Sequence, residues 1–275
     1  TLYAIKGDFF EVKFNRKNGM LSSYSINNKE LIKAPVRFNF RRALTDNDRG
    51  WKVGEKMKIW QDAGLHYTVQ QFHITSSDKD KTVIKGEYAF TDSKATAIIE
   101  HTVFANGTIE IEYNISIPLN LPNIPRIGLQ FEIEKELQNI DWYGRGPHEN
   151  YIDRESGAAI GIYQTTLNQW ITPYVRPQEN SNRGGIRWLR FSQGTHQLQF
   201  SAVGEPFCAS AWPYTISTLE QTTHDFELKM HNNIIVDIDC NQMGVGGDCS
   251  WGLPVLQKYQ IKPSKYQYKF IISAK

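Results

Sequence analysis

Apolar and polar residues alternate along most of this chain, as they do in strands that bury one face. Between residues 108 and 117 every second residue is apolar, and the residues between them are acidic or small and polar. Other segments alternate in the same way or are rich in β-branched and aromatic residues. We therefore predict strands at residues 10–15, 20–24, 67–76, 82–91, 95–104, 108–117, 126–134, 197–202, 224–231, 233–239 and 266–273.

Two Asn-Gly pairs separate neighbouring predicted strands. Asn18 and Gly19 lie between the first two strands, and Asn106 and Gly107 precede the strand at 108–117. Asn-Gly favours the left-handed conformation that a two-residue hairpin turn requires. Both pairs therefore predict antiparallel hairpins.

Helical spacing of apolar residues is rare in this sequence. Residues 50–65 show it best, and residues 219–223 could add one turn. Many strands with one or two short helices predict an all-β fold. We expect residues 1–275 to form a single large antiparallel β-sandwich.

Composition and charge exclude several classes of function. The 275 residues are 40% hydrophobic and 22% charged, with 31 basic and 29 acidic residues and a net charge of +2. The sequence has no basic stripe of the kind that indicates nucleic-acid binding. It also has no apolar run long enough to indicate a membrane span. Cys208, Cys240 and Cys249 are too scattered for a disulfide framework or a zinc site. We expect no metal or cofactor in this chain.

Four stretches depart from the alternation and are rich in Gly, Pro, Trp, Arg and acidic residues, namely residues 45–50, 142–151, 174–180 and 243–251. Loops on a rigid sheet are where function concentrates. Asp46, Asn47 and Asp48 resemble the start of a calcium loop, but the later ligands of that motif are missing. Helix capping by Asp48 and ion pairs to Arg41, Arg42 or Arg49 are therefore favoured over a metal site.

Glu149 and Glu179 are the carboxylates of the second and third stretches. A glycosidase needs two carboxylates across the scissile bond, but nothing in the sequence sets the separation of these two. Arg176 and Arg183 flank Glu179 and offer ion pairs instead. His148 is adjacent to Glu149, and adjacent side chains on a strand point to opposite faces. We assign both glutamates to shaping their loops and no catalytic residue to the chain.

The fourth stretch is the best candidate for ligand contact. Gly246 and Gly247 form an open turn, followed by Asp248 and Trp251. A Trp ring stacks on the apolar face of a sugar while a carboxylate accepts hydrogen bonds from its hydroxyls. From the residues alone, a core position for Trp251 is equally well supported.

In this order, the four stretches resemble motifs of the C-terminal small-chain domain of glycoside hydrolase family 2 β-galactosidases. The matching letters are TDNDRG at 45–50, WYGRGP at 142–147, ENY at 149–151, PQE at 177–179 and MGVGGD at 243–248. The resemblance covers essentially the whole chain. Cys249 stands where the family often has a second Asp, and Leu44 stands where it often has Pro.

The resemblance implies a supersandwich similar to galactose mutarotase, forming the C-terminal part of a longer, homo-oligomeric polypeptide. The catalytic glutamates, and any divalent or monovalent cations, would belong to an upstream TIM-barrel domain. The full-length protein would hydrolyse β-D-galactosides with retention, in the cytoplasm or the periplasm. This chain would complete the rim of the active site. Trp251 and Asp248 would bind substrate there, and the loop would be shaped by Asp46, Asn47, Asp48, Glu149, Glu179, Gly246 and Gly247.

Two other classes of function compete with this interpretation. A stand-alone mutarotase-like epimerase needs a histidine and a carboxylate that converge on the concave sheet. None of His148, His196, His224 and His231 is placed beside such a carboxylate by the sequence. An independent carbohydrate-binding module needs an aromatic platform of its own, whereas Trp251 is the one good candidate and is expected to need a partner domain.

Overall fold

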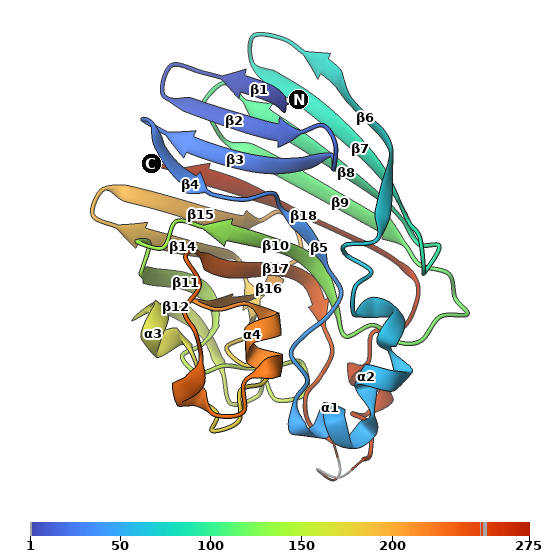
Figure 1. Cartoon of the computed structure of the whole chain (residues 1–275). Helices are drawn as coiled ribbons and strands as arrows, with labels where there is room; N and C mark the ends of the chain where they lie inside the picture. The colour runs from blue at the N-terminus through green and yellow to red at the C-terminus, as the bar shows by residue number, and fades with distance from the viewer. Residues whose placement is uncertain (1, 248, 250–251) are drawn as a thin grey trace.

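The computed structural model describes residues 2–247, 249 and 252–275, which fold into two nine-stranded antiparallel sheets (Figure 1). Sheet A runs in the order β1 (Leu2–Lys6), β2 (Phe10–Asn15), β3 (Met20–Ile26), β4 (Lys29–Ile32), β10 (Arg126–Ile133), β17 (Ile234–Gln242), β16 (Phe207–Trp212) and β13 (Arg183–Ile186), with β5 (Arg37–Asn39) paired to β10. Sheet B runs in the order β12 (Ala159–Thr166), β11 (Asn139–Gly146), β14 (Trp188–Gln193), β15 (His196–Ala202), β18 (Lys265–Ala274), β9 (Ile109–Ser116), β8 (Thr96–Phe104), β7 (Lys81–Phe90) and β6 (Tyr67–Ser77).

The main hydrophobic core lies between the two sheets. Phe131 of β10 meets Phe200 of β15 with ring centroids 5.1 Å apart, and Phe270 of β18 joins them from sheet B. Burying one such side chain contributes about 1.5 to 3 kcal/mol. The alternation that the sequence shows along β9 is confirmed, because its apolar residues are buried and the residues between them are half-buried. The predicted all-β sandwich fold is therefore confirmed.

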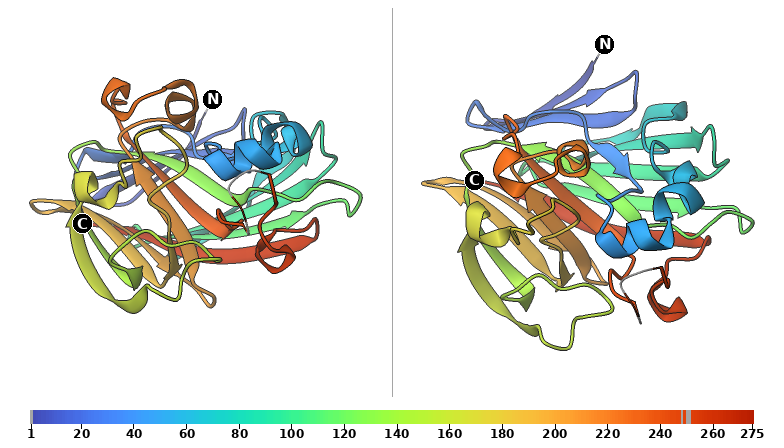
Figure 2. Two further views of the ribbon diagram at one scale, coloured as in Figure 1. Left: turned by 90° about the horizontal axis from the view of Figure 1, so that it is seen from below. Right: turned by 60° about the horizontal axis from the view of Figure 1, so that its bottom comes forward.

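A second layer covers the outer face of sheet A, which is the face turned away from sheet B. The short helix α4 (Ile216–Gln221) packs Ile216 and Leu219 against Trp212 and Ile235. Helices α1 (Asp46–Trp51) and α2 (Val53–Lys56) lie on the same side (Figure 2). Helix α3 (Leu167–Trp170) follows β12, and single 3-10 turns lie at Lys58–Trp60, Asp225–Glu227 and Gln257–Tyr259. The longest of these helices has six residues, and no helix among the described residues is long and apolar enough to cross a membrane.

Both predicted hairpins are confirmed. Asn18 and Gly19 join β2 to β3, and Asn106 and Gly107 join β8 to β9. Gly19 and Gly107 adopt φ values of 68° and 80°. This left-handed conformation is accessible to glycine without steric cost.

Two predicted elements are wrong. Residues 224–231 form no strand; Asp225–Glu227 is a 3-10 turn, and the Glu227 side chain accepts a hydrogen bond from the His224 amide. The helix predicted at 50–65 begins earlier, at Asp46, and is interrupted at Lys52, which has a φ of 63°. Thr45 caps the helix and sets its start, and the left-handed Lys52 ends its first segment.

Several strands were not predicted, including β11, β12, β14 and β16. Residues 142–146 were assigned to a loop because of their glycines, yet they form the end of β11. Gly144 lies against Ile186, where a Cβ atom would come within 3.0 Å of the backbone. Here glycine permits close approach of two chain segments within regular structure.

Candidate functional site

The residues 243–247, which we call the glycine-rich segment, are held by side chains from two distant parts of the chain. Arg42 donates to the carbonyl oxygens of Met243 and Gly244, the latter at 2.9 Å. Asn47 donates to the carbonyl oxygen of Val245 at 2.8 Å. Asp153 Oδ2 accepts from the Gly246 amide at 2.6 Å. The first, second and fourth motif regions of the sequence therefore converge on this segment.

Arg42 is fixed by a fully buried ion pair with Asp48. Its Nε lies 3.0 Å from Asp48 Oδ2, and its Nη2 lies 2.8 Å from Oδ1. Such a two-pronged guanidinium–carboxylate pair fixes both partners in orientation as well as distance. Burial acts to lower the pKa of Arg42, but the charge and hydrogen bonds of Asp48 outweigh it, and the pKa is raised. Arg42 therefore stays charged while it binds the glycine-rich segment.

Asp48 also completes the start of α1. The Thr45 hydroxyl accepts from the Asp48 amide at 3.0 Å, and Asp48 Oδ2 accepts from the Thr45 amide at 3.1 Å. This is a capping box, in which Thr45 and not Asp48 is the N-cap residue. The expected pairing of Asp48 with Arg42 is observed. Asp46 pairs with Arg49 at 3.2 Å.

A second buried ionic cluster lies on the outer face of sheet A. Arg126 of β10 has no exposed side-chain surface and lies 3.0 Å from Glu179 and 3.1 Å from Asp239. A hydrogen bond from Arg126 to Asp237 completes the set. Tyr151 donates to Glu179 at 3.3 Å. The third motif is thus anchored by Arg126, not by Arg176 or Arg183 as its flanking sequence indicated.

In this cluster one guanidinium faces three carboxylates, and this imbalance explains the direction in which the pKa of each group is shifted. Burial alone would lower the pKa of Arg126, but the surrounding carboxylates raise it. Burial raises the pKa of Glu179 and Asp237, and raises that of Asp239 well above its ordinary value. Asp239 receives no aligned hydrogen bond from the described residues, whereas Asp237 accepts one from Gln130 at 3.0 Å. Because Asp239 has the fewest donors, less opposes the effect of burial on its pKa.

Glu149 is the other carboxylate considered for catalysis, and its oxygens are also occupied by hydrogen bonds within the chain. Its Oε2 accepts from the Ser181 amide at 2.7 Å, and its Oε1 accepts from Arg154 and from the Tyr174 hydroxyl. The Glu149 side chain is 7% exposed, and Glu179 has none of its side chain exposed. Neither carboxylate faces an open site in the structure.

The third motif also contacts the first one directly. The Asp46 amide donates to Gln178 Oε1 at 3.1 Å, and the Glu179 amide donates to the Ala43 carbonyl oxygen at 3.1 Å. All four motif regions are thus linked by hydrogen bonds around the start of α1. Sequence order gave no indication of this clustering.

The glycines of the fourth motif allow close packing against Asp153 and the chain beyond. A Cβ atom on Gly246 would lie 3.1 Å from Asp153 Oδ2, and one on Gly247 would lie 3.2 Å from the Leu253 carbonyl oxygen. The predicted substrate-binding residues Asp248 and Trp251 lie outside the described residues. The structure therefore describes the support of this segment up to Gly247.

Three residues of the site were missed by sequence reasoning, namely Arg126, Asp237 and Asp239. Residues 234–240 read as an apolar run interrupted by Asp237 and Asp239. Acidic residues at alternate positions of a strand share one face, and that spacing was the available signal for a buried cluster. Asp153 belongs to the second motif of the family resemblance, but its contact with the Gly246 amide was not predicted.

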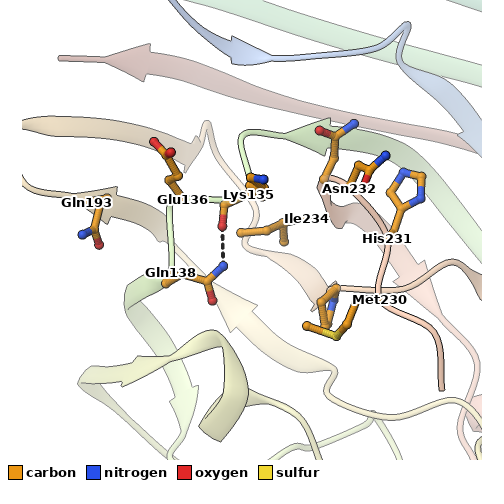
Figure 3. A pocket seen from close by; sticks show the side chains of 10 residues that line it. Lys135, Glu136, Gln138, Gln193, Met230, His231, Asn232 and Ile234 are labelled. Carbon is orange, nitrogen blue, oxygen red and sulfur yellow. Dashed lines mark hydrogen bonds between the residues drawn. The ribbon is translucent and has the colours of Figure 1, made fainter. Parts of the chain in front are cut away.

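A hollow with a volume of about 710 Å³ lies elsewhere, at the far end of sheet A (Figure 3). Figure 3 shows two groups of polar side chains around it, Glu136, Gln138 and Gln193 in one and His231 and Asn232 in the other. His231 Nε2 lies 3.1 Å from Glu132 Oε2, a histidine–carboxylate pair that the sequence did not reveal. Among the described residues, no three or more His, Cys, Asp or Glu side chains are grouped to hold a metal ion.

The two large sheets and their covered outer face place the chain in one class of fold, the galactose mutarotase-like β-sandwich. The galactose 1-epimerase from Lactobacillus acidophilus NCFM matches with a TM-score of 0.60 at 8% identity, over 100% of this chain and 94% of that one. A galactose mutarotase-like protein from Lactobacillus casei matches with a TM-score of 0.52 at 9% identity, over 100% of both chains. These likenesses concern the fold alone. Within this class, the chain belongs to the β-galactosidase small chain family, whose model matches residues 6–272.

The similar curated proteins are β-galactosidases. The enzyme from Priestia megaterium is 34% identical over 90% of this chain, and that from Streptococcus thermophilus is 32% identical over 98%. The matched part is 24% and 26% of the length of these two relatives. The chain thus spans about a quarter of the curated relatives it matches, and it represents a β-galactosidase domain.

Proposed function

We propose that this chain is the C-terminal domain of a longer β-galactosidase and completes the rim of its active site. The longer protein would hydrolyse terminal β-D-galactosides with retention of configuration. In that mechanism one carboxylate protonates the leaving oxygen while a second attacks the anomeric carbon. Both would come from an upstream TIM-barrel domain, together with any cations, and the full-length protein would be a homo-oligomer.

The observation that carries this proposal is the convergence of the four motifs on the glycine-rich segment. Arg42, Asn47 and Asp153 bind its backbone, and Arg42 is itself locked to Asp48. Ordering a loop in this way loses conformational entropy. Binding sites require such order, because the residues that contact the ligand must be held in position. Those residues include Asp248 and Trp251, to which we assign hydrogen bonding and stacking with the sugar.

The role of the domain is tested by hydrolysis of a chromogenic β-galactoside. The purified chain is assayed alone, and again after mixing with the upstream remainder of its β-galactosidase. We expect no turnover by the chain alone and turnover by the mixture. Turnover by the chain alone would contradict the proposal, and Glu149→Gln and Glu179→Gln would then be the first variants to make.

The role of Trp251 is tested separately in the full-length enzyme. Trp251→Ala should weaken substrate binding by about 1 kcal/mol, the value of one aromatic stacking contact. Tyr3→Ala is the control, because Tyr3 is a half-buried aromatic on β1, at the edge of sheet A. Equal KM values for Trp251→Ala and the wild-type enzyme would remove Trp251 from the proposed site.

An aldose epimerase is the second candidate, because the structure brings a histidine and a carboxylate together. Glu132 also accepts a hydrogen bond from Asn233 at 3.0 Å and faces Arg37 at 3.4 Å. A carboxylate bonded to its own histidine and to two further groups is poorly placed to act on a sugar between them. We therefore assign His231 and Glu132 to structure. Polarimetry of freshly dissolved α-D-galactose checks this, since faster mutarotation that His231→Asn abolishes would favour the epimerase.

A further inference from the structure

We propose that strand β12, at the open end of sheet B, pairs antiparallel with β12 of a second copy of this chain. Within the described residues β12 pairs with β11 on one side and with no strand on the other. It has eight residues, and none of them is charged or proline. Ile160 and Ile162 are 48% and 71% exposed. An uncharged, uninterrupted edge of this kind is a ready template for another strand.

The other strands that end the two sheets differ from β12. The opposite edge of sheet B, β6, has two irregularities in its register with β7, at Val69/Gln71 and Ile74/Ser76. In sheet A, β13 has four residues and an irregular register with β16, and β1 has five residues and ends at Lys6. Bulges, short length and lysine are the devices that prevent pairing between edges. β12 has none of these protections.

The side chains beside β12 extend the apolar surface inward from the edge. Ile162 lies opposite Tyr143 of β11, and Tyr143 lies opposite Trp188 of β14, so the three side chains form one row on the outer face of sheet B. Tyr143 is 36% exposed. Directly opposed side chains in an antiparallel sheet lie on the same face. The row therefore ends at the free edge, where a further strand would continue it.

A second copy fits this edge because an antiparallel pair of identical strands has two-fold symmetry. If Ile162 opposes Ile162 of the second copy, the two rows of Ile162, Tyr143 and Trp188 become continuous. The same register aligns Ile160 of one copy with Gln164 of the other.

The charges beside β12 also fit this register. Arg145 lies opposite Ile160 and Asp141 lies opposite Gln164, so Arg145 of one copy shares a row with Asp141 of the other. Each is already paired within its own chain, Arg145 with Glu155 at 3.1 Å and Asp141 with Arg190 at 2.9 Å. A centre at Ile160 would instead place two arginines in one row. The self-pairing therefore opposes no like charges when it is centred on Ile162.

Sedimentation equilibrium of the 275-residue chain tests the interface. We expect the wild-type chain to form dimers and Ile162→Lys to weaken dimerisation at least tenfold. The matched control is Ile74→Lys, a similar change at the β6 edge, where Ile74 is 42% exposed. Because Ile162 is 71% exposed, the lysine is compatible with folding, which circular dichroism verifies. A monomeric wild-type chain, or equal weakening by both variants, would overturn the proposal.

Cross-linking tests the register. In Ile162→Cys, the two introduced thiols would face each other across the two-fold axis at a separation that a disulfide spans. We expect mild oxidation to produce a covalent dimer in which mass spectrometry finds residue 162 joined to residue 162. The wild-type chain, with its exposed Cys249, and Ile74→Cys are the controls. A dimer that gives no such link, or links equally in the controls, would exclude this register.

Discussion

The outer face of sheet A carries charged side chains in two regions that differ in burial. Around the glycine-rich segment, the Arg126 and Glu179 side chains are 0% exposed, and Arg42 and Asp48 are 0% and 3% exposed. At the hollow of Figure 3, His231 is 33% exposed, and Glu132, with which it pairs, is 14% exposed. Both regions contain ion pairs of similar length, so distance alone does not distinguish them.

The difference in burial decides what each region can do. A buried charge must be fully paired, because an unpaired one costs several kcal/mol. Half-exposed pairs are solvated already and contribute about 0 to 1 kcal/mol. The first region is therefore held in one geometry, which suits the support of a binding loop. The second can exchange its partners for water and tolerates substitution.

Removing Arg126 should have the largest effect of any single change in these two regions. Arg126→Ala leaves Glu179, Asp237 and Asp239 buried without their cation, and we expect a loss of about 3 to 5 kcal/mol in the free energy of unfolding. Arg37→Ala is the control from the second region, since Arg37 is 51% exposed beside Glu132. It should cost at most about 1 kcal/mol. Urea unfolding measures both, and similar losses would mean that the two regions do not differ.

The same contrast shows what the sequence could and could not predict. The strands with clear alternation, such as β9, were predicted because each residue's face follows from its position in the strand. β11 was missed because Gly144 and Gly146 resemble a turn, although they serve close packing. The local sequence pattern therefore identifies a strand when its residues alternate between buried and exposed. It fails where glycines in a strand allow another chain segment to pack closely.

The candidate site was predicted as four motifs but not as one place. Arg42 contacts Met243 across 201 positions of sequence, and Arg126 contacts Asp237 across 111. Such contacts depend on the strand order of sheet A, which no local pattern specifies. The flanking arginines of Glu179 were therefore a misleading guide, because the partner that matters lies on β10.

Arg42→Lys should have the next largest effect. Lysine keeps the charge, but one ammonium cannot reproduce the two-pronged pair with Asp48 while also binding the carbonyl oxygens of Met243 and Gly244. Leaving buried acceptors unpaired costs roughly 1 to 3 kcal/mol. Hydrogen exchange of the glycine-rich segment should increase in this variant. Arg145→Lys, at a half-exposed pair with Glu155, should leave that exchange unchanged.

Asn47→Ala should cost less, because it removes one hydrogen bond, to the Val245 carbonyl oxygen. A single neutral hydrogen bond contributes about 1 kcal/mol. Asn233→Ala is the matched change in the second region, where Glu132 retains His231 as a donor. We expect hydrogen exchange of the glycine-rich segment to rise in Asn47→Ala alone. A rise in both variants would show that the segment responds to general destabilisation.

The smallest changes exchange one carboxylate for an amide of the same shape. The pH dependence of their effect on stability should have opposite signs in the two regions. Burial raises the pKa of Asp239 far above its ordinary value, so the stability that its protonated form provides is present at low pH and is lost as the pH rises. Burial also acts to raise the pKa of Glu132, but hydrogen bonds from Asn233 and His231 outweigh it, and the pKa is lowered. The contribution of Glu132 is therefore present at neutral pH and is lost as the pH falls.

Asp239→Asn should accordingly gain stability relative to the wild-type chain as the pH rises from about 4, close to the ordinary pKa of an aspartate. Glu132→Gln should lose stability relative to the wild-type chain as the pH rises to about 4, because the lowered pKa of Glu132 places the change below the ordinary pKa of a glutamate. Urea unfolding of the three proteins at a series of pH values measures the two differences. If the two stability differences change with pH in opposite directions, the contrast is supported: the cluster around Asp239 has too few cations, whereas Glu132 has sufficient donors. Slopes of the same sign would mean that Asp239 is as well compensated by Arg126 as Glu132 is by its neighbours.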